Sequence, residues 1–353
     1  MNDTIKTRLK EIKTIYIVTM LLAFTILAVV LGLKLGFISI TWSQLLYVFT
    51  DMLADGKQHN LDCELLDVIL ELRLPRLILA GCVGAGLTLS GIIMQAIVKN
   101  PLADPYILGV SSGASMGATI AIFFSIGSVF GSQSIGICAF IGAFLVSLLV
   151  VFVANVSGFK TSSGLLLSGL AISAICSSMS SLIAYLGKNK EGMEAITYWL
   201  MGSVANAKIE SVLLLLAMIM VLFLYFLTQS RNMNIMLQGY EVAMTLGLDI
   251  NKIRNKYLVL NGLLVGFIVY NSGTIGFVGL IVPHIVRLVF GANHKRIIPT
   301  AVSFGGLFAV VMDIVSRTLI KGIDIPLGVI FSLLGAPCFI YLLLKQSYRF
   351  GAD

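Results

Sequence analysis

The sequence is poor in charge and in histidine, and each scarcity excludes a class of protein. Only 12% of the 353 residues are Asp, Glu, Lys or Arg, whereas 58% are hydrophobic. A soluble domain carries about 25% charged residues, so most of this chain does not face water. The three histidines are not spaced as metal ligands, and we expect neither a metal site nor a cofactor bound by this chain.

Cysteine usage and missing motifs exclude further classes. The five cysteines are odd in number and no two are close in sequence, which argues against a disulfide framework. No G-x-x-x-x-G-K-[S/T] phosphate loop is present, so we expect any ATP hydrolysis to occur on another chain. A membrane enzyme would need clustered acids or histidines at one membrane face, and the sequence has no such cluster.

Long apolar runs are abundant, and several approach or exceed the roughly 20 residues that cross a bilayer. The first run is too long for a signal peptide core, so we predict that it stays as a membrane span. No linker rich in Pro or Ser divides the chain. We therefore predict one all-α, polytopic membrane domain over residues 1–353. Its ten predicted spans are 15–35, 75–98, 106–126, 135–155, 163–186, 211–228, 256–272, 275–291, 300–320 and 326–345.

The distribution of charge predicts the orientation. If the N-terminus is cytoplasmic, basic residues such as Lys13, Lys99 and Arg296 gather in cytoplasmic segments, and most acidic residues lie outside. This bias is the positive-inside pattern, so we expect both termini in the cytoplasm. It also accounts for the net charge of +7 without nucleic acid as a partner.

Two segments outside the spans are long. Residues 38–74 are predicted to face outward. Residues 229–255, QSRNMNIMLQGYEVAMTLGLDINKIRN, are predicted to face the cytoplasm. The inward segment has helix formers, capping residues and an apolar face, which predicts short helices at the membrane surface.

The stretch NPLADPYILG, residues 100–109, interrupts the apolar runs. Asn100-Pro101 and Asp104-Pro105 impose extended or turn geometry on the residue before each proline. Asp104 is a good N-cap, and Pro105 suits the first helical turn. We therefore predict a compact cytoplasmic turn that leads into a third span capped by Asp104.

Here the sequence resembles a known family. RLPRLILAGCVGAGLTLSGIIMQAIVKNPLADPYILGVSSGA, residues 73–114, resembles the signature of the FecCD-type permeases, the iron-siderophore, haem and vitamin B12 ABC importers. The similarity continues with WLMGS at 199–203, GTIGFVGLIVPHIVRLVFG at 273–291 and DIPLGVIFSLLGAPCFIYLLLK at 324–345. The resemblance implies the ten-helix fold of type II ABC importer permeases, in agreement with the predicted spans.

The resemblance also implies a function and partners. The chain would be a transport subunit for an iron chelate, a ferric siderophore in the first instance, with haem and cobalamin as alternatives. A second permease copy or a paralogue would lie beside it in the cytoplasmic membrane. An ABC ATPase dimer, which uses the ATP, would dock inside. A substrate-binding lipoprotein or periplasmic protein would dock outside.

The inward segment is the expected docking surface for the ATPase. Glu241, Ala243 and Gly247, followed by Leu248, resemble the Glu-Ala-Ala…Gly pattern of ABC permeases. A glycine there permits a sharp turn and a close approach to the partner. The alternative is an ordinary amphipathic loop helix.

Three outer arginines resemble the family's contacts to acidic residues of the binding protein: Arg73, Arg76 and Arg317. Local structure is the alternative, since Asp313 can pair with Arg317 at i, i+4 and the other two arginines can snorkel. Asp324 stands where the family usually has Glu, which shortens its reach by one methylene.

The expected translocation path or gate involves Gln95, Trp199 and Gly202. Gln95 lies inside a span, where a polar side chain either lines an aqueous path or bonds to a neighbouring helix. Both interpretations stay open for this residue. A passive channel is a further alternative, but it would need neither the 229–255 segment nor the RLPR pair.

Overall fold

The computed structural model describes residues 2–36, 40–53, 63–126, 131–156, 162–238 and 240–350. These ranges are helical and contain no β-strand, as predicted. Each predicted span overlaps one helix of the described chain. These helices are α1 (Asn2–Lys34), α4 (Leu74–Val98), α5 (Val110–Phe123), α7 (Ser134–Val156), α8 (Ser162–Gly187), α10 (Ile209–Thr228), α13 (Ile250–Ser272), α14 (Val278–Phe290), α15 (His294–Thr318) and α16 (Leu327–Phe350).

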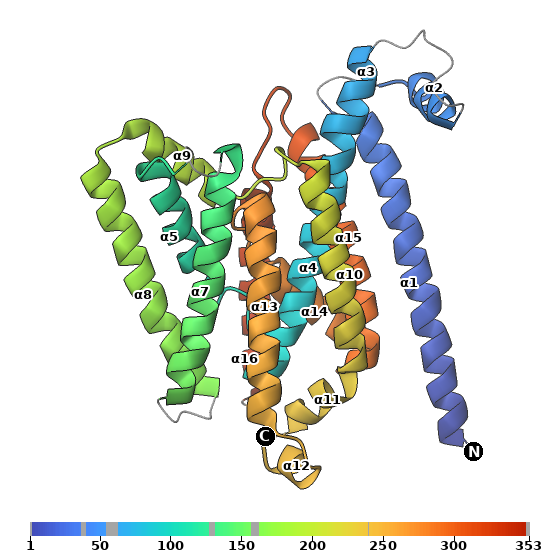
Figure 1. Cartoon of the computed structure of the whole chain (residues 1–353). Coiled ribbons are helices and arrows are strands. Elements are labelled where there is room, and N and C mark those ends of the chain that lie inside the picture. The colour runs from blue at the N-terminus through green and yellow to red at the C-terminus, as the bar shows by residue number, and fades with distance from the viewer. Residues whose placement is uncertain are drawn as a thin grey trace.

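Seven segments of the described chain are long and apolar enough to cross a membrane. The helices α5 and α14 are apolar but shorter, and α13 begins with the polar turns INKIRNK. The number of ten spans therefore stays a prediction. Both chain ends lie at the same end of the bundle (Figure 1), as cytoplasmic termini require.

The connections contain helices of their own. The outward segment 38–74 contains α2 (Trp42–Leu53), α3 (Cys63–Asp67) and a π-helical stretch (Val68–Arg73) that runs directly into α4. The helix α9 (Lys190–Leu200) follows α8. The inward segment contains α11 (Ser230–Gln238) and α12 (Tyr240–Thr245), as its helix formers and caps predicted.

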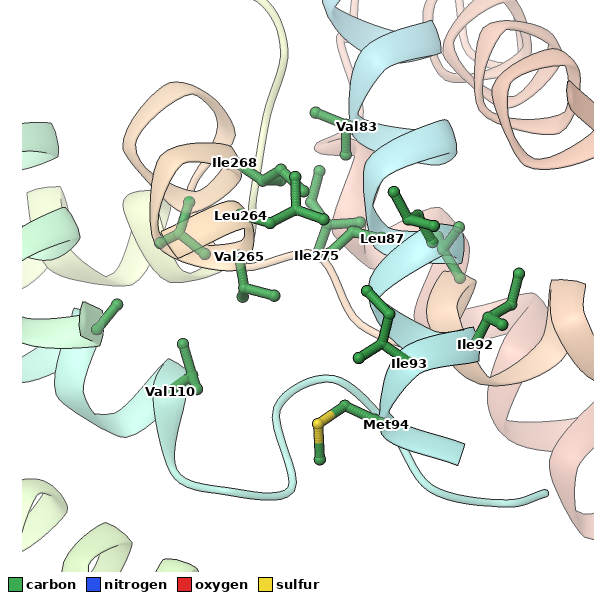
Figure 2. Packing of buried hydrophobic residues seen from close by; sticks show 14 of the residues in the cluster. Val83, Leu87, Ile92, Ile93, Met94, Val110, Leu264, Val265, Ile268 and Ile275 are labelled. Carbon is green, nitrogen blue, oxygen red and sulfur yellow. The ribbon is translucent and has the colours of Figure 1, made fainter. Parts of the chain in front are cut away.

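Helix α4 forms the centre of the molecule. In the apolar 18-residue stretch of the segment that contains α4, 83% of the residues are buried, compared with 11% in the corresponding stretch of α1 at the edge of the bundle. Figure 2 shows Val83 and Leu87 of α4 beside Leu264 and Ile268 of α13. Burial on all sides lets α4 fix the positions of its neighbours.

Glycine allows the closest helix approaches around α4. A Cβ on Gly84 would lie 2.2 Å from the carbonyl oxygen of Gly305 in α15. A Cβ on Gly91 would lie 1.8 Å from that of Gly279 in α14. Such distances exclude any side chain, which is how small residues join helices where no hydrophobic effect drives them together.

The predicted start of the third span was wrong. Helix α5 begins at Val110, and its N-cap is Gly109 with φ of 80°, whereas the sequence had predicted a helix from 106 capped by Asp104. Instead, Asp104 Oδ1 accepts a hydrogen bond from the Tyr106 N–H at 2.8 Å, and Asn100 Oδ1 accepts one from Leu102 at 2.9 Å. These two Asx turns use the capping oxygens locally, so the helix starts only after Gly109.

Candidate functional site

Three of the family-like motifs meet at one backbone junction. The Gly328 N–H donates to the Gly202 carbonyl at 3.1 Å, which joins WLMGS to the start of α16. Gly202 has φ of 69°, and a Cβ on it would lie 2.3 Å from the Thr274 carbonyl oxygen. A Cβ on Gly273 would similarly lie 2.4 Å from the Trp199 carbonyl oxygen. Side chains at these glycines would separate the three segments.

The NPLADPY turn contacts this junction from the other side. The Ile275 N–H donates to the Tyr106 hydroxyl oxygen at 3.4 Å, and the Pro105 ring lies against Gly279, where a Cβ would be 2.5 Å away. Phe277, which precedes α14, has φ of 68°, a left-handed conformation that bulky residues rarely adopt. All four motifs therefore meet around the segment that leads into α14.

Asp104 in this turn is partly buried. Burial raises the pKa of Asp104 to about 6, although the hydrogen bond from the Tyr106 N–H acts in the opposite direction. The carboxylate oxygen holds the turn by accepting the hydrogen bond from the Tyr106 N–H.

Gln95 joins two helices. It is fully buried, and its Oε1 accepts a hydrogen bond from Arg287 Nη2 at 2.9 Å, while its Nε2 makes a long contact of 3.5 Å with the Leu280 carbonyl. Gln95 of α4 is thereby bonded to α14 at two places. The helix-bonding interpretation has a geometric basis in this chain, and the path-lining interpretation stays a prediction.

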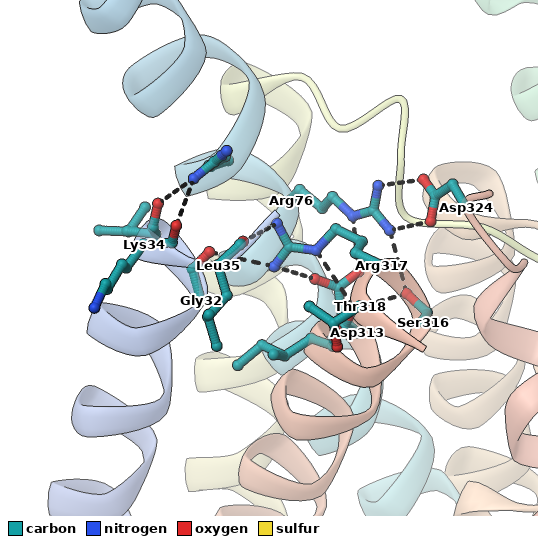
Figure 3. A network of polar contacts seen from close by, with 12 residues as sticks. Gly32, Lys34, Leu35, Arg76, Asp313, Ser316, Arg317, Thr318 and Asp324 are labelled. Carbon is teal, nitrogen blue, oxygen red and sulfur yellow. Dashed lines mark hydrogen bonds and ion pairs between the residues drawn. The ribbon is translucent and has the colours of Figure 1, made fainter. Parts of the chain in front are cut away.

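Two of the outer arginines cap the end of α1 (Figure 3). Arg73 Nη1 donates to the carbonyls of Leu33 at 2.5 Å and Lys34 at 3.2 Å. Arg317 reaches the carbonyls of Gly32 at 3.4 Å and Leu35 at 3.5 Å. Helix C-terminal carbonyls lack intrahelical donors and attract cations, so both guanidinium groups satisfy the last turn of α1.

The third arginine binds two carboxylates. Arg76 Nε lies 2.7 Å from Asp313 Oδ1, and its other nitrogens contact Asp324 at 2.5 and 2.8 Å. Arg317 Nη2 lies 3.0 Å from Asp313 Oδ2, which is the i, i+4 pair that the sequence offered as the alternative to docking. The shorter Asp324 still reaches Arg76 bidentately, so the missing methylene does not prevent this contact.

The same arginines line an outer pocket of about 240 Å³ together with Gly36, Val68, Leu72 and Ala205. Arg73 and Arg317 are each 6% exposed, so most of their surface contacts the protein. The three arginines that the sequence singled out line one pocket, but their partners from α1 and Asp324 are distant in sequence and gave no local signal. Their docking role stays a prediction.

The end of α12 has a glycine-based helix terminus. The Leu248 N–H donates to the Ala243 carbonyl at 3.0 Å, and the Gly247 N–H donates to that of Met244 at 2.9 Å. With Gly247 at φ of 77°, this is a Schellman motif. No atom lies within 4 Å of a Cβ built on Gly247, so the chain leaves the space beside it open.

The tip around α12 presents apolar side chains to the outside. Val242, Met244 and Leu246 are 39%, 56% and 57% exposed, whereas Ala243 is buried. The side chain of Glu241 lies outside those that the structure describes. Asp249 then begins α13, and the hydrogen bond from the Lys252 N–H lowers the pKa of Asp249. Contiguous exposed apolar residues indicate an interaction surface.

Asn234 joins α11, the helix that precedes this tip, to the start of α15. Its Oδ1 accepts hydrogen bonds from the His294 N–H at 2.9 Å and from His294 Nδ1 at 2.7 Å. Its Nδ2 donates to Asn293 Oδ1 at 3.2 Å, and Asn293 itself caps α15 by accepting from the Lys295 N–H. We call these residues (Asn234, Asn293 and His294) the α11–α15 corner. Sequence analysis missed the corner, since only the Asn293 cap has a local signal.

Comparison with known proteins gives a consistent result. A sequence model of the family described as the FecCD transport family matches residues 22–345. The hemin transport system permease protein HmuU of Yersinia pestis is 36% identical over 78% of this chain and 83% of its own length. The cobalamin import system permease protein BtuC of Halobacterium salinarum is 38% identical over 79% of this chain and 73% of its own.

A solved structure has the same architecture. A metal-chelate type ABC transporter in an inward-facing conformation is similar with a TM-score of 0.79 and 31% identity, over 94% of this chain and 99% of that one. The predicted permease fold is therefore confirmed.

Proposed function

The chain belongs to the FecCD transport family, and on that premise we propose that it imports an iron chelate, a ferric siderophore in the first instance. It is the permease subunit of an ABC importer in the cytoplasmic membrane, with separate ATPase and substrate-binding partners. Haem and cobalamin remain alternative cargoes, which the relatives named above support directly. The observation that carries the proposal is the convergence of four family-like motifs around the segment that leads into α14.

We propose that the tip around α12 docks on the ATPase. Its exposed apolar side chains, Val242, Met244 and Leu246, support this role. The open space beside Gly247 supports it too, since a partner can approach the backbone there. Glu241, Ala243, Gly247 and Leu248 would form the coupling turn. ATP would be bound and hydrolysed by the partner, and both termini would be cytoplasmic.

We propose that the cluster formed by Arg73, Arg76 and Arg317 with Asp313 and Asp324, the outer arginine corner, contacts the binding protein. The three arginines line one pocket, and their cations favour an acidic side chain. Between two permease copies, or this chain and a paralogue, the motif junction with Trp199 and Gly202 would act as the gate. Gln95 would hold α4 against α14 near the path.

The docking role of the arginines has a direct test. Arg76→Gln should weaken association with the binding protein about tenfold or more in low salt, with a smaller loss at high salt, because a steering charge is removed. Surface plasmon resonance on the reconstituted permease measures this.

Asp324→Asn is the matched control for this test. It loosens the same guanidinium but keeps its charge, and it should preserve the association. A folded Arg76→Gln variant that binds as tightly as the unmodified chain would remove the docking assignment and leave a purely local role.

The cargo is identified by uptake into proteoliposomes that contain the permease, its ATPase and its binding protein. Radiolabelled ferric siderophore, haem and cobalamin are compared at equal concentration with ATP inside or outside. Preferential accumulation of the ferric siderophore supports the proposal. Preferential accumulation of haem or cobalamin would replace the cargo and keep the permease function.

A further inference from the structure

A second pocket, of about 310 Å³, lies between α1 and α15 at the end of the bundle that holds both termini. Helix α1 lines it with Glu11, Ile15 and Val18 among others, and α15 lines it with Lys295, Arg296 and Pro299. None of the roles proposed above uses this pocket. Its lining is charged at one end and apolar at the other.

The pocket lies where charged residues give way to apolar ones along both helices. In α1 the charged stretch that ends at Lys13 is followed by an apolar run from Ile15, and in α15 Lys295 and Arg296 precede Ile297. Val18 lies two turns deeper than Glu11, about 10 Å along a helix. If both helices span a membrane, this order puts the charged residues on the headgroup side of the pocket and Ile15, Val18 and Pro299 on the acyl-chain side.

Helix stability does not explain the cations of this pocket. Lys295 and Arg296 occupy the first turn of α15, which has no acidic residue, although the helix dipole disfavours cations at that end. Lys295 Nζ lies 2.7 Å from Glu11 Oε1, but these side chains are 66% and 42% exposed. An exposed ion pair of this kind contributes little to the stability of the protein. The two side chains can therefore rearrange around a ligand.

We propose that this pocket binds an anionic phospholipid. Lys295 and Arg296 contact the lipid phosphate, and Ile15, Val18 and Pro299 pack on the adjoining acyl chain. A lipid fits better than a soluble anion because Ile15, Val18 and Pro299 give the lining an apolar part beside its cations. Helix α1 is largely unburied by protein, so lipids reach the pocket from the bilayer. Basic pockets between spanning helices bind such headgroups in other membrane proteins.

The position of the pocket gives the lipid a consequence for transport. Lys295 follows His294, whose backbone and ring are both bonded to Asn234 of the α11–α15 corner. A lipid held by Lys295 and Arg296 therefore stabilises the α15 end of the connection to α12. The binding itself does not depend on the proposed transport function.

Native mass spectrometry of the purified permease tests the proposal. The protein is titrated with phosphatidylglycerol or with phosphatidylcholine of the same chain length. We expect preferential retention of phosphatidylglycerol. Lys295→Gln and Arg296→Gln should each lower its apparent affinity about fivefold, the effect of one cation beside an anionic lipid. Excess inorganic phosphate should not displace the lipid.

Two controls keep the result interpretable. Lys13→Gln removes an exposed charge of α1 at the same membrane level that does not line the pocket, and it should not change lipid retention. Lys295→Arg/Arg296→Lys keeps both charges and should retain the lipid. Equal binding of the two lipids, displacement by phosphate, or unchanged binding by a folded Lys295→Gln/Arg296→Gln variant would overturn the proposal.

Discussion

Asp313 shows how the outer arginine corner depends on single residues. Its carboxylate is fully buried and is shared by Arg76 and Arg317, and these arginines also bind Asp324 and the end of α1. A buried charge is tolerated only with such partners. Through the side chain of Asp313, the outer arginine corner therefore connects α1, α4, α15 and the turn before α16.

Asp313→Asn leaves the two arginines with too little negative charge at a buried site. We expect this variant to lose about 3–5 kcal/mol of unfolding free energy, the range for breaking a buried ion pair. Denaturant titration in detergent measures the loss. Asp324→Asn is the control. Because Asp324 is 29% exposed, its replacement should lower the unfolding free energy much less. Equal, small losses for both variants would contradict the assignment of Asp313 as the central counter-ion.

At the scale of elements, α12 and its glycine terminus determine coupling in this account. Gly247→Val places a β-branched residue at φ of 77° and fills the open space beside the tip. We expect ATP-driven transport to fall at least tenfold while membrane insertion continues. Gly247→Asn, which tolerates the left-handed conformation, should keep more activity than the valine variant. Unchanged transport in Gly247→Val would remove the coupling assignment.

The α11–α15 corner is the second element that this account makes essential. Asn234→Ala removes all three hydrogen bonds of the Asn234 side chain, so we expect ATP hydrolysis to continue while transport per ATP falls several-fold. Asn234→Asp keeps an acceptor for both His294 groups but loses the donor to Asn293, and its defect should be intermediate. Parallel ATPase and uptake assays on one complex make the comparison. Equal ratios in all three proteins would show that the corner does not transmit coupling.

Sequence patterns predicted elements better than their connections. Apolar runs located the helices that underlie the ten predicted spans, and helix formers with caps located α11 and α12. The start of α5 was wrong because Asn100 and Asp104 serve local turns rather than a helix cap. The α11–α15 corner was missed because Asn234 and His294 are 60 residues apart, and no local pattern connects them.

At the scale of the whole molecule, α4 is the central helix, and other helices lie on both sides of it. Figure 1 shows α5, α7, α8 and α9 on one side and α1 on the other, with α12 at the end that holds the termini. The outer arginine corner lies at the opposite end, beside α3. The two docking surfaces proposed above would therefore lie at opposite ends of one packed bundle, as an importer driven from the cytoplasm requires.

The central claim is that this chain forms an ATP-driven importer, and accumulation against a gradient tests it most directly. Proteoliposomes containing the permease, its ATPase and its binding protein are loaded with ATP or a non-hydrolysable analogue. The internal and external concentrations of the labelled chelate are then measured at steady state. The account predicts an internal concentration well above the external one only with ATP. Equal concentrations on both sides, reached with either nucleotide, would mean that the chain is a passive channel and would contradict the account.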